Sequence, residues 1–269
     1  MRVKSSSKPH VARKFLDQLV SHGRYHFTSR EVRSALGVSA NASRLAINRL
    51  RRQGMIASPA RGFYVIVPPE YRSLGCLPAE QFIPYLMEYK QEKYYAGLLS
   101  AAQYYGAAHQ RPQEFQVFVA KNRRPVRCGK IQVKFIARKH IAKVKVRPFN
   151  TSHGQIQVST PEATAIDLAG YPQHAGGLDQ VATVLLELAH EIDPDGLKEA
   201  ATTAPVSWVQ RLGYLLEFVD ASERLNPLQK WVQENAHEYA RLVPDAPSEK
   251  WQRNKTWKLE INTELDPDL

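Results

Sequence analysis

Residues 28–67, TSREVRSALGVSANASRLAINRLRRQGMIASPARGFYVIV, decide the fold of the first part of the chain. Thr28 and Glu31 have the spacing of a capping box, so they predict the start of a helix, which Gly37 would end. Ser39 is a good N-cap for the next helix, which runs to just before a second glycine. Two short helices joined by a turn that contains glycine are typical of a helix-turn-helix.

The segments on either side extend this pattern. Apolar residues at helical spacing predict an earlier helix over residues 11–19. After the third helix, two short apolar runs at 55–58 and 63–67 flank a turn that contains Pro59 and Gly62, which predicts a β-hairpin. A hairpin directly after the third helix is the wing of a winged helix. We therefore predict a winged helix-turn-helix, the DNA-binding domain, over residues 1–69.

The third helix has two different faces. Its apolar residues would pack inward, whereas Asn41, Arg44 and Asn48 recur at helical spacing on the opposite face. Arg reads guanine and Asn reads adenine in the major groove, while other basic residues hold phosphates. No acidic residue occurs between Val32 and Pro69, although an ordinary solvated face would share some of these features. The predicted DNA-binding residues are Ser39, Asn41, Arg44, Asn48, Arg49, Arg51, Arg52 and the wing residue Arg61.

Charge is distributed unevenly along the 269 residues, which carry a formal net charge of +11. Residues 1–69 hold 13 Lys or Arg against two acidic residues, whereas residues 151–269 hold nine against 19. This distribution favours a polyanionic partner for the first half of the chain, and a solvated basic surface is the alternative.

The rest of the chain predicts a larger α+β domain. Pro68 and Pro69 end the first domain, a linker follows at 70–78, and residues 79–269 form the second domain. Period-two alternation indicates a small, mainly antiparallel sheet surrounded by helices. Thr160, followed by Pro161, is an expected N-cap. Helices are expected at 79–89, 93–106, 178–192, 205–219 and 228–241, and strands at 115–119, 131–136, 144–146, 156–158 and 257–262.

A second basic segment lies on this predicted sheet, where no acidic residue occurs between Glu114 and Glu162. We expect it to form a surface for DNA backbone, RNA or an acidic protein, or merely to keep the protein soluble. Its residues are Lys121, Arg123, Arg124, Arg127, Lys130, Lys134, Arg138, Lys139, Lys143, Lys145 and Arg147.

Motifs for chemistry are scarce. The sequence has no phosphate-binding glycine loop or dinucleotide fingerprint, and its nine His lack metal-ligand spacing. Glu88-Tyr89-Lys90 resembles a nuclease triplet but falls in an expected helix. Cys76 and Cys128 read as free thiols of a reducing compartment. We predict no enzyme activity, no cofactor and no metal. The absence of a signal peptide or membrane span predicts a cytoplasmic protein.

Several stretches, in order, resemble the AbiEi antitoxin family of type IV toxin–antitoxin (abortive infection) systems. They include the end of the winged helix at residues 62–66, the tract 93–102 with Gly106 to His109 after it, residues 159–168, Gly176-Gly177, and residues 254–262. The resemblance implies an N-terminal domain that binds inverted repeats at its own promoter and represses the operon, a contribution to phage defence. It also implies a C-terminal domain that counteracts a nucleotidyltransferase toxin without requiring a stable complex.

Other functions stay open. One is a stand-alone regulator whose C-terminal domain senses a small molecule, and another is a nucleic-acid-processing enzyme targeted by the winged helix. Binding to an inverted repeat needs two copies on double-stranded DNA, but a monomer or weak dimer in solution satisfies it.

Overall fold

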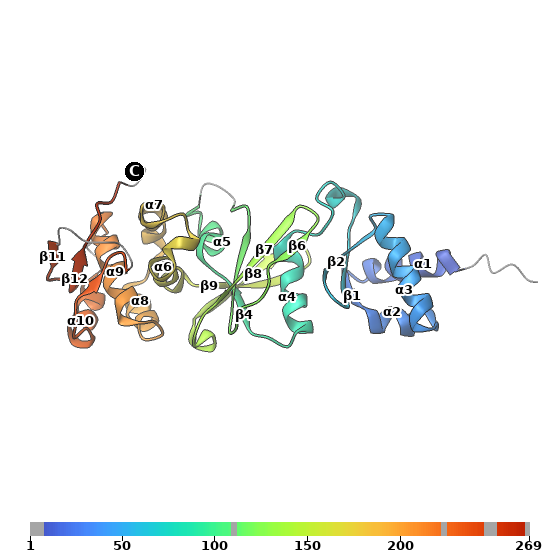
Figure 1. Cartoon of the computed structure of the whole chain (residues 1–269), viewed down its shortest axis with the longest axis horizontal. Coiled ribbons are helices and arrows are strands. Elements are labelled where there is room, and N and C mark those ends of the chain that lie inside the picture. Colours follow the sequence, from blue (N-terminus) through green and yellow to red (C-terminus); the bar gives the residue numbers. More distant parts are fainter. Residues whose placement is uncertain (1–7, 109–111, 222–224, 245–251, 267–269) are drawn as a thin grey trace, which may run out of the picture.

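The structure, a computed structural model, describes residues 8–108, 112–221, 225–244 and 252–266; His109 of the family resemblance lies outside them. The molecule is elongated, with three parts in succession along its long axis (Figure 1). A small helical head with a three-stranded sheet lies at one end. A six-stranded sheet lies in the middle, and a layer of helices with a second three-stranded sheet lies at the other end.

The head, residues 8–66, has the predicted winged-helix architecture. It consists of α1 (Lys8–Ser21), β1 (His26–Thr28), α2 (Ser29–Leu36), α3 (Ala40–Arg52), β2 (Ile56–Ala60) and β3 (Phe63–Ile66). The capping box is present, since Thr28 N donates to Glu31 Oε2 at 2.6 Å and Glu31 N donates to Thr28 Oγ1 at 3.3 Å. The strands pair in the order β1-β3-β2, and both pairings are antiparallel. Phe27, Val32, Ile47 and Leu50 are buried in one cluster between this sheet and the helices of the head.

The body, residues 79–266, is built on a sheet in the order β6-β7-β5-β4-β9-β8. Its strands are β4 (Tyr94–Ala96), β5 (Phe115–Val119), β6 (Val126–Cys128), β7 (Ile131–Ala137), β8 (Val146–Thr151) and β9 (Gly154–Ser159). Three of the pairings are antiparallel, and β5–β7 and β4–β9 are parallel. Together with the helices this confirms the α+β class.

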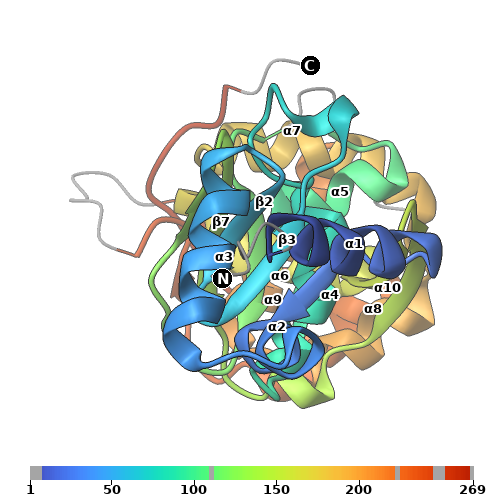
Figure 2. The same cartoon turned by 90° about the vertical axis from the view of Figure 1, so that its right-hand side faces the viewer.

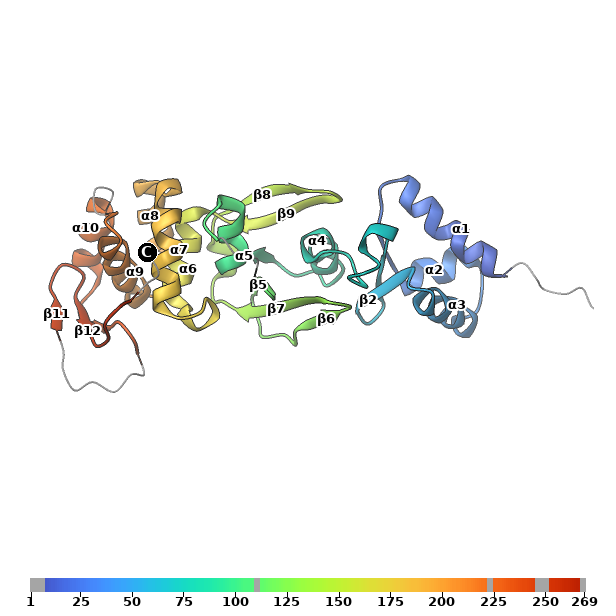
Figure 3. The ribbon, with the colours of Figure 1, turned by 90° about the horizontal axis from the view of Figure 1, so that it is seen from above.

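Helices cover this sheet from two directions. α4 (Ala79–Tyr89) lies between the β8–β9 pair and the β6–β7 pair, as Figure 3 shows, and it also faces the head. α5 (Leu98–Ala102) lies toward the far end, where the helical layer begins. That layer contains α6 (Pro161–Gly170), α7 (Leu178–Leu188), α8 (Pro194–Ala201), α9 (Val206–Phe218) and α10 (Asn226–Asn235), with the strands β10 (Ala240–Arg241), β11 (Gln252–Asn254) and β12 (Leu259–Ile261).

Two expected helices are wrong in part. Residues 94–96 form strand β4 instead of the start of a helix over 93–106, because Tyr95 pairs with Phe118 of β5 and is fully buried. Tyrosine favours strands and alanine favours helices, so the local sequence is ambiguous and a partner distant in sequence decides between the two states. The helix expected at 228–241 ends at Asn235, and residues 240–241 pair with β12 instead. The predicted cap at Thr160 is confirmed, since its side chain accepts from Ala163 N.

The head and the body share a hydrophobic core. Phe63 and Val65 of the wing lie in one buried cluster with Phe82 of α4 and Val133 of β7. The connection at 70–78, expected as a linker, contributes to the same cluster through Leu77, which is 1% exposed. Figure 2, which looks onto the head, shows it stacked directly in front of the body. None of the helices among the described residues is long and apolar enough to cross a membrane.

Candidate nucleic-acid interface

Helix α3 presents the face that its sequence pattern predicts. Asn41 and Arg44 are exposed and Asn48 is half-buried, while Ile47 and Leu50 are buried on the other side. Ser39 caps the helix by accepting a hydrogen bond from Ala42 N at 3.3 Å. Capping fixes the start of the helix and therefore the direction in which Asn41 and Arg44 point.

Sequence reasoning missed an apolar residue on this face. Leu45 is 60% exposed, although a leucine in a short helix usually packs into the core. It lies between Asn41 and Asn48 on the helix surface, where a side chain of this kind contacts a thymine methyl group. The exposed face of α3 therefore combines hydrogen-bonding and apolar groups, as readers of base edges do.

A concave site between α2 and α3 gathers further arginines. Arg30 and Arg33 of α2 line a cavity of about 390 Å³ with Arg44 of α3 and Tyr64 of the wing. Arg30 and Arg33 were not expected from the sequence, although their spacing of three residues puts them on one face of α2. Three guanidinium groups around one concave surface suit a phosphate oxygen.

The end of α3 and the wing carry the remaining predicted residues. Arg49, Arg51 and Arg52 lie in the last turn of α3, where cations are favoured by the helix dipole. Arg61 is exposed at the tip of the wing, in the turn that Gly62 closes with φ +80. The structure also brings Arg51 into one cavity, of about 440 Å³, with Arg72 and Arg127. Arg127 belongs to β6, so the body adds a cation beside α3.

The acidic residue of the second helix does not offset these charges. Burial raises the pKa of Glu31, but hydrogen bonds from Arg24 and Thr28 outweigh it and hold the pKa below its ordinary value. Glu31 is thus ionised and neutralised by Arg24, and residues 32–69 contain no other carboxylate. The exposed face of α3 therefore carries one sign of charge.

The second basic segment is not one surface. Arg138 contradicts the expectation directly, because its side chain is only 2% exposed and is paired with Asp167. Arg123 forms an ion pair with Glu92, and Lys145 forms one with Glu199. The alternation of apolar and polar residues predicted that these basic residues would be exposed. The carboxylates that pair with three of them come from segments distant in sequence, so the pattern could not reveal the pairing. The remaining residues are divided between the head side of the sheet (Arg127 and Lys130), strands β7 and β8 (Lys134 and Arg147), and the segments after β5 and β7 (Lys121, Arg124, Lys139 and Lys143).

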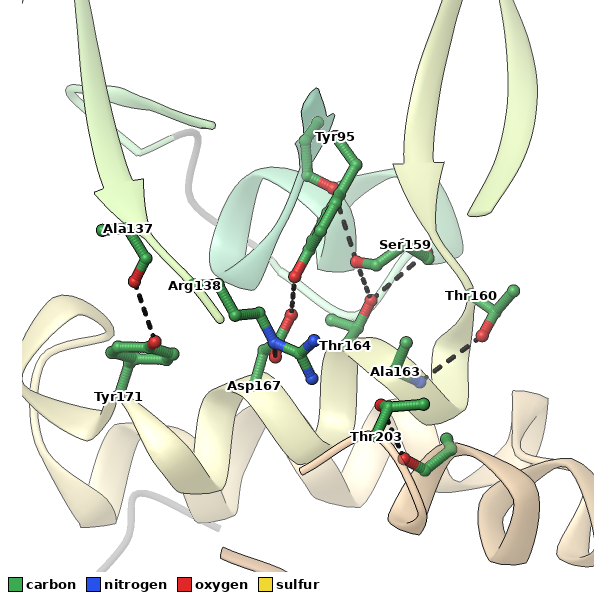
Figure 4. Close-up of polar contacts among 12 residues, drawn as sticks. Tyr95, Ala137, Arg138, Ser159, Thr160, Ala163, Thr164, Asp167, Tyr171 and Thr203 are labelled. Carbon is green, nitrogen blue, oxygen red and sulfur yellow. Dashed lines mark hydrogen bonds and ion pairs between the residues drawn. The ribbon is translucent and has the colours of Figure 1, made fainter. Parts of the chain in front are cut away.

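A buried polar cluster lies where β7 ends on the helical layer. Arg138 Nε donates to Asp167 Oδ1 at 2.7 Å, and Tyr95 Oη donates to Asp167 Oδ2 at 2.7 Å (Figure 4). Burial raises the pKa of Asp167 to about 6, against the opposing effect of Arg138. Burial would lower the pKa of Arg138, but Asp167 outweighs it and raises that pKa. The sequence gives no sign of this pair.

Aromatic contacts hold the head against the body. The ring of His26 stacks on that of Tyr85 of α4 with centroids 4.0 Å apart, and Tyr25 lies 3.8 Å from the ring of His153. Burial, reinforced by Arg24, lowers the pKa of His26 to about 4, so this imidazole is neutral at physiological pH. Neutral stacked rings make a contact that does not depend on salt.

A winged helix whose third helix is capped and basic is an architecture that many transcriptional regulators use. Residues 14–67 match a family model described as a transcriptional regulator, AbiEi antitoxin, and residues 95–218 match the AbiEi antitoxin C-terminal domain. The chain belongs to the AbiEi antitoxin family, as its sequence resemblance predicts.

A solved structure supports the fold. The RV2827C protein from Mycobacterium tuberculosis is similar with a TM-score of 0.66 at 19% identity, covering 94% of this chain and 91% of that one. At this identity the similarity shows a shared fold over nearly the whole length. No curated protein matches the sequence.

Proposed function

We propose that this protein is a type IV antitoxin and a transcriptional autorepressor that acts in the cytoplasm by binding rather than by catalysis. The observation that carries the DNA-binding part is the one-signed face of α3, with Asn41, Arg44 and Asn48 exposed or half-buried beside Leu45. Family membership supports the antitoxin part. Its toxin partner would be a nucleotidyltransferase, which the body counteracts without requiring a stable complex.

In this proposal, Asn41, Arg44 and Asn48 read bases of an inverted repeat at the protein's own promoter, and two copies bind it together. Arg49, Arg52 and Arg61 hold phosphates, which position the head without selecting sequence. Arg72 and Arg127, which share a cavity with Arg51, would extend the phosphate contacts from the head onto the body. A winged helix that bound DNA without the body would lack these two phosphate contacts.

The DNA-binding part is tested by titrating a labelled promoter fragment and a scrambled fragment with the full chain. Arg44→Ala and Asn48→Ala should each weaken promoter binding by about 5- to 150-fold, which corresponds to 1–3 kcal/mol per lost base contact. They should change binding to the scrambled fragment far less. Arg49→Ala is the matched control, because loss of a phosphate contact weakens both fragments alike. Unchanged promoter selectivity in both variants would refute the recognition-helix assignment.

The antitoxin part needs a separate assay. Because the wing shares a core with the body, the head cannot simply be deleted, and the full chain with Arg44→Ala and Asn48→Ala is the better reagent. Co-expressed with a nucleotidyltransferase encoded beside it, this double variant should protect cells as the wild type does while losing repression. Loss of both activities together would contradict a division of labour between head and body.

A further inference from the structure

A cavity of about 930 Å³ opens at the far end of the body's sheet from the head. Two of its walls are the segments that follow β5 and β7, namely Lys121 with Asn122 and Arg138 with Lys139. These two strands are parallel neighbours, with Val119 opposite Ala137. The carboxyl ends of adjacent parallel strands are where open sheets place their ligand sites. The remaining wall is the turn that leads into α9.

Arg138 offers this cavity an unused edge. Its Nε is held by Asp167, but its Nη1 and Nη2 are buried and have no hydrogen-bond partner among the described residues. In Figure 4 these two nitrogens point away from Asp167. Buried donors are nearly always satisfied in folded proteins, so this pair requires an acceptor that enters from the cavity, and a water molecule or an oxygen of a bound anion can fill that place. A guanidinium fixed on one edge is well arranged to hold two oxygens of a phosphate on the other.

The surroundings of Arg138 favour an anion. Lys139 and Lys143 are exposed where they line the cavity, together with Lys121, and none of the described lining residues is acidic. Helix α9, of 13 residues, begins at this wall with Pro205 as its N-cap and no side-chain cap bond. Its first backbone N–H groups therefore add positive potential to the same space.

The cavity also has an aromatic wall. The rings of Tyr171 and Trp208 lie 4.8 Å apart at 67°, and the guanidinium carbon of Arg138 lies 5.9 Å from the centre of the Trp208 ring. Both aromatic residues line the cavity and are only half-buried. An inorganic anion makes no favourable packing contact with an aromatic wall, whereas a heterocyclic base packs well against it.

We propose that this cavity binds a free nucleotide, with its phosphates on Arg138, Lys139 and Lys143 and its base against Trp208. This goes beyond the proposed function and uses no residue of the head.

The test is calorimetric titration of the full-length protein with ATP, inorganic tripolyphosphate and adenosine. We expect saturable binding of ATP at concentrations up to about 1 mM, and weaker binding of the other two. Lys139→Ala with Lys143→Ala should weaken ATP binding roughly tenfold or more, because two charge-assisted contacts are lost. Lys230→Ala with Lys255→Ala removes the same charge from exposed positions on α10 and the β11–β12 turn, and should leave it unchanged.

Four results would overturn the proposal or a part of it. One is no saturable ATP binding in this range, and a second is an equal loss in the two double variants. Tripolyphosphate binding as tightly as ATP would overturn the role of the base. Saturating promoter DNA is a further control, since the cavity lies at the opposite end of the sheet from α3. ATP binding should survive this DNA, and its displacement would assign ATP to the head instead.

Discussion

Replacing Arg138 by methionine would leave Asp167 buried without its cation. Arg138 and Asp167 are 2% and 0% exposed, so the carboxylate stays out of contact with solvent while another side chain of similar size takes the place of the guanidinium. Methionine fills similar volume without charge, and Tyr95 remains as a hydrogen-bond donor to the carboxyl. The buried carboxyl then avoids the energetic cost of a desolvated charge only by taking up a proton.

The size of the effect follows from the pKa of Asp167. In the wild type it is about 6 in the folded protein against an ordinary value of 3.8, so ionisation of this carboxyl lowers stability as pH rises from about 4 to 6 and adds no further loss above 6. In Arg138→Met the folded pKa rises further, so the loss continues above pH 6. Each pH unit adds about 1.4 kcal/mol, which gives a difference between variant and wild type that grows by about 2–3 kcal/mol from pH 6 to 8.

Urea unfolding followed by tryptophan fluorescence at pH 6, 7 and 8 measures this difference. Arg138→Met combined with Asp167→Asn is the matched control, because it keeps an acceptor for Tyr95 but has no carboxyl to titrate. Its stability should run parallel to that of the wild type over this range. A constant gap between Arg138→Met and the wild type, or an equal widening in the double variant, would refute the reasoning.

Three more predictions concern the fold. Thr28→Ala removes the capping box and should lower the free energy of unfolding by about 1–2 kcal/mol, measured by urea denaturation, with Thr28→Ser as the conservative control. Gly213→Ala would put a methyl group 2.1 Å from Cε3 of the buried Trp257, so we expect thermal unfolding roughly 5–10 °C lower; an unchanged melting temperature would contradict the packing. The pKa of His26, lowered to about 4, means that stability is full above about pH 6.5 and falls as pH drops toward 4; His26→Phe, which keeps the stack on Tyr85, should weaken that acid dependence in pH-dependent melting curves.

The head was predictable because its determinants are local. Thr28 with Glu31, and Ser39, act on residues three positions away, so their spacing in the sequence already contains the hydrogen bonds seen in the structure. The exposed face of α3 also follows from helical periodicity. Helical spacing already places Leu45 on the face of Asn41 and Asn48, but a leucine is ordinarily assigned to the core, so its exposure was not expected.

The body was less predictable because its determinants are distant in sequence. Tyr95 becomes a strand residue through β5, and Arg138 becomes buried through Asp167, which lies 29 residues further along the chain. A run of basic residues predicts a solvent-exposed surface, because unpaired charges are rarely buried. A carboxylate from a distant segment can pair with one of these residues and allow it to be buried. The cavity beside Arg138 depends on the same long-range arrangement.

Because the wing and the body share a core, the two proposed activities, repression and antitoxin action, would be lost together when the protein unfolds in a cell. Phe63 and Val65 leave their places when the cluster around Phe82 is lost, so a chain whose body unfolds also loses the shape of its wing. Under the proposed function, a damaged molecule would not remain on the promoter as a repressor without antitoxic activity. The supply of antitoxin and the occupancy of its promoter would fall together, and renewed transcription would then restore both.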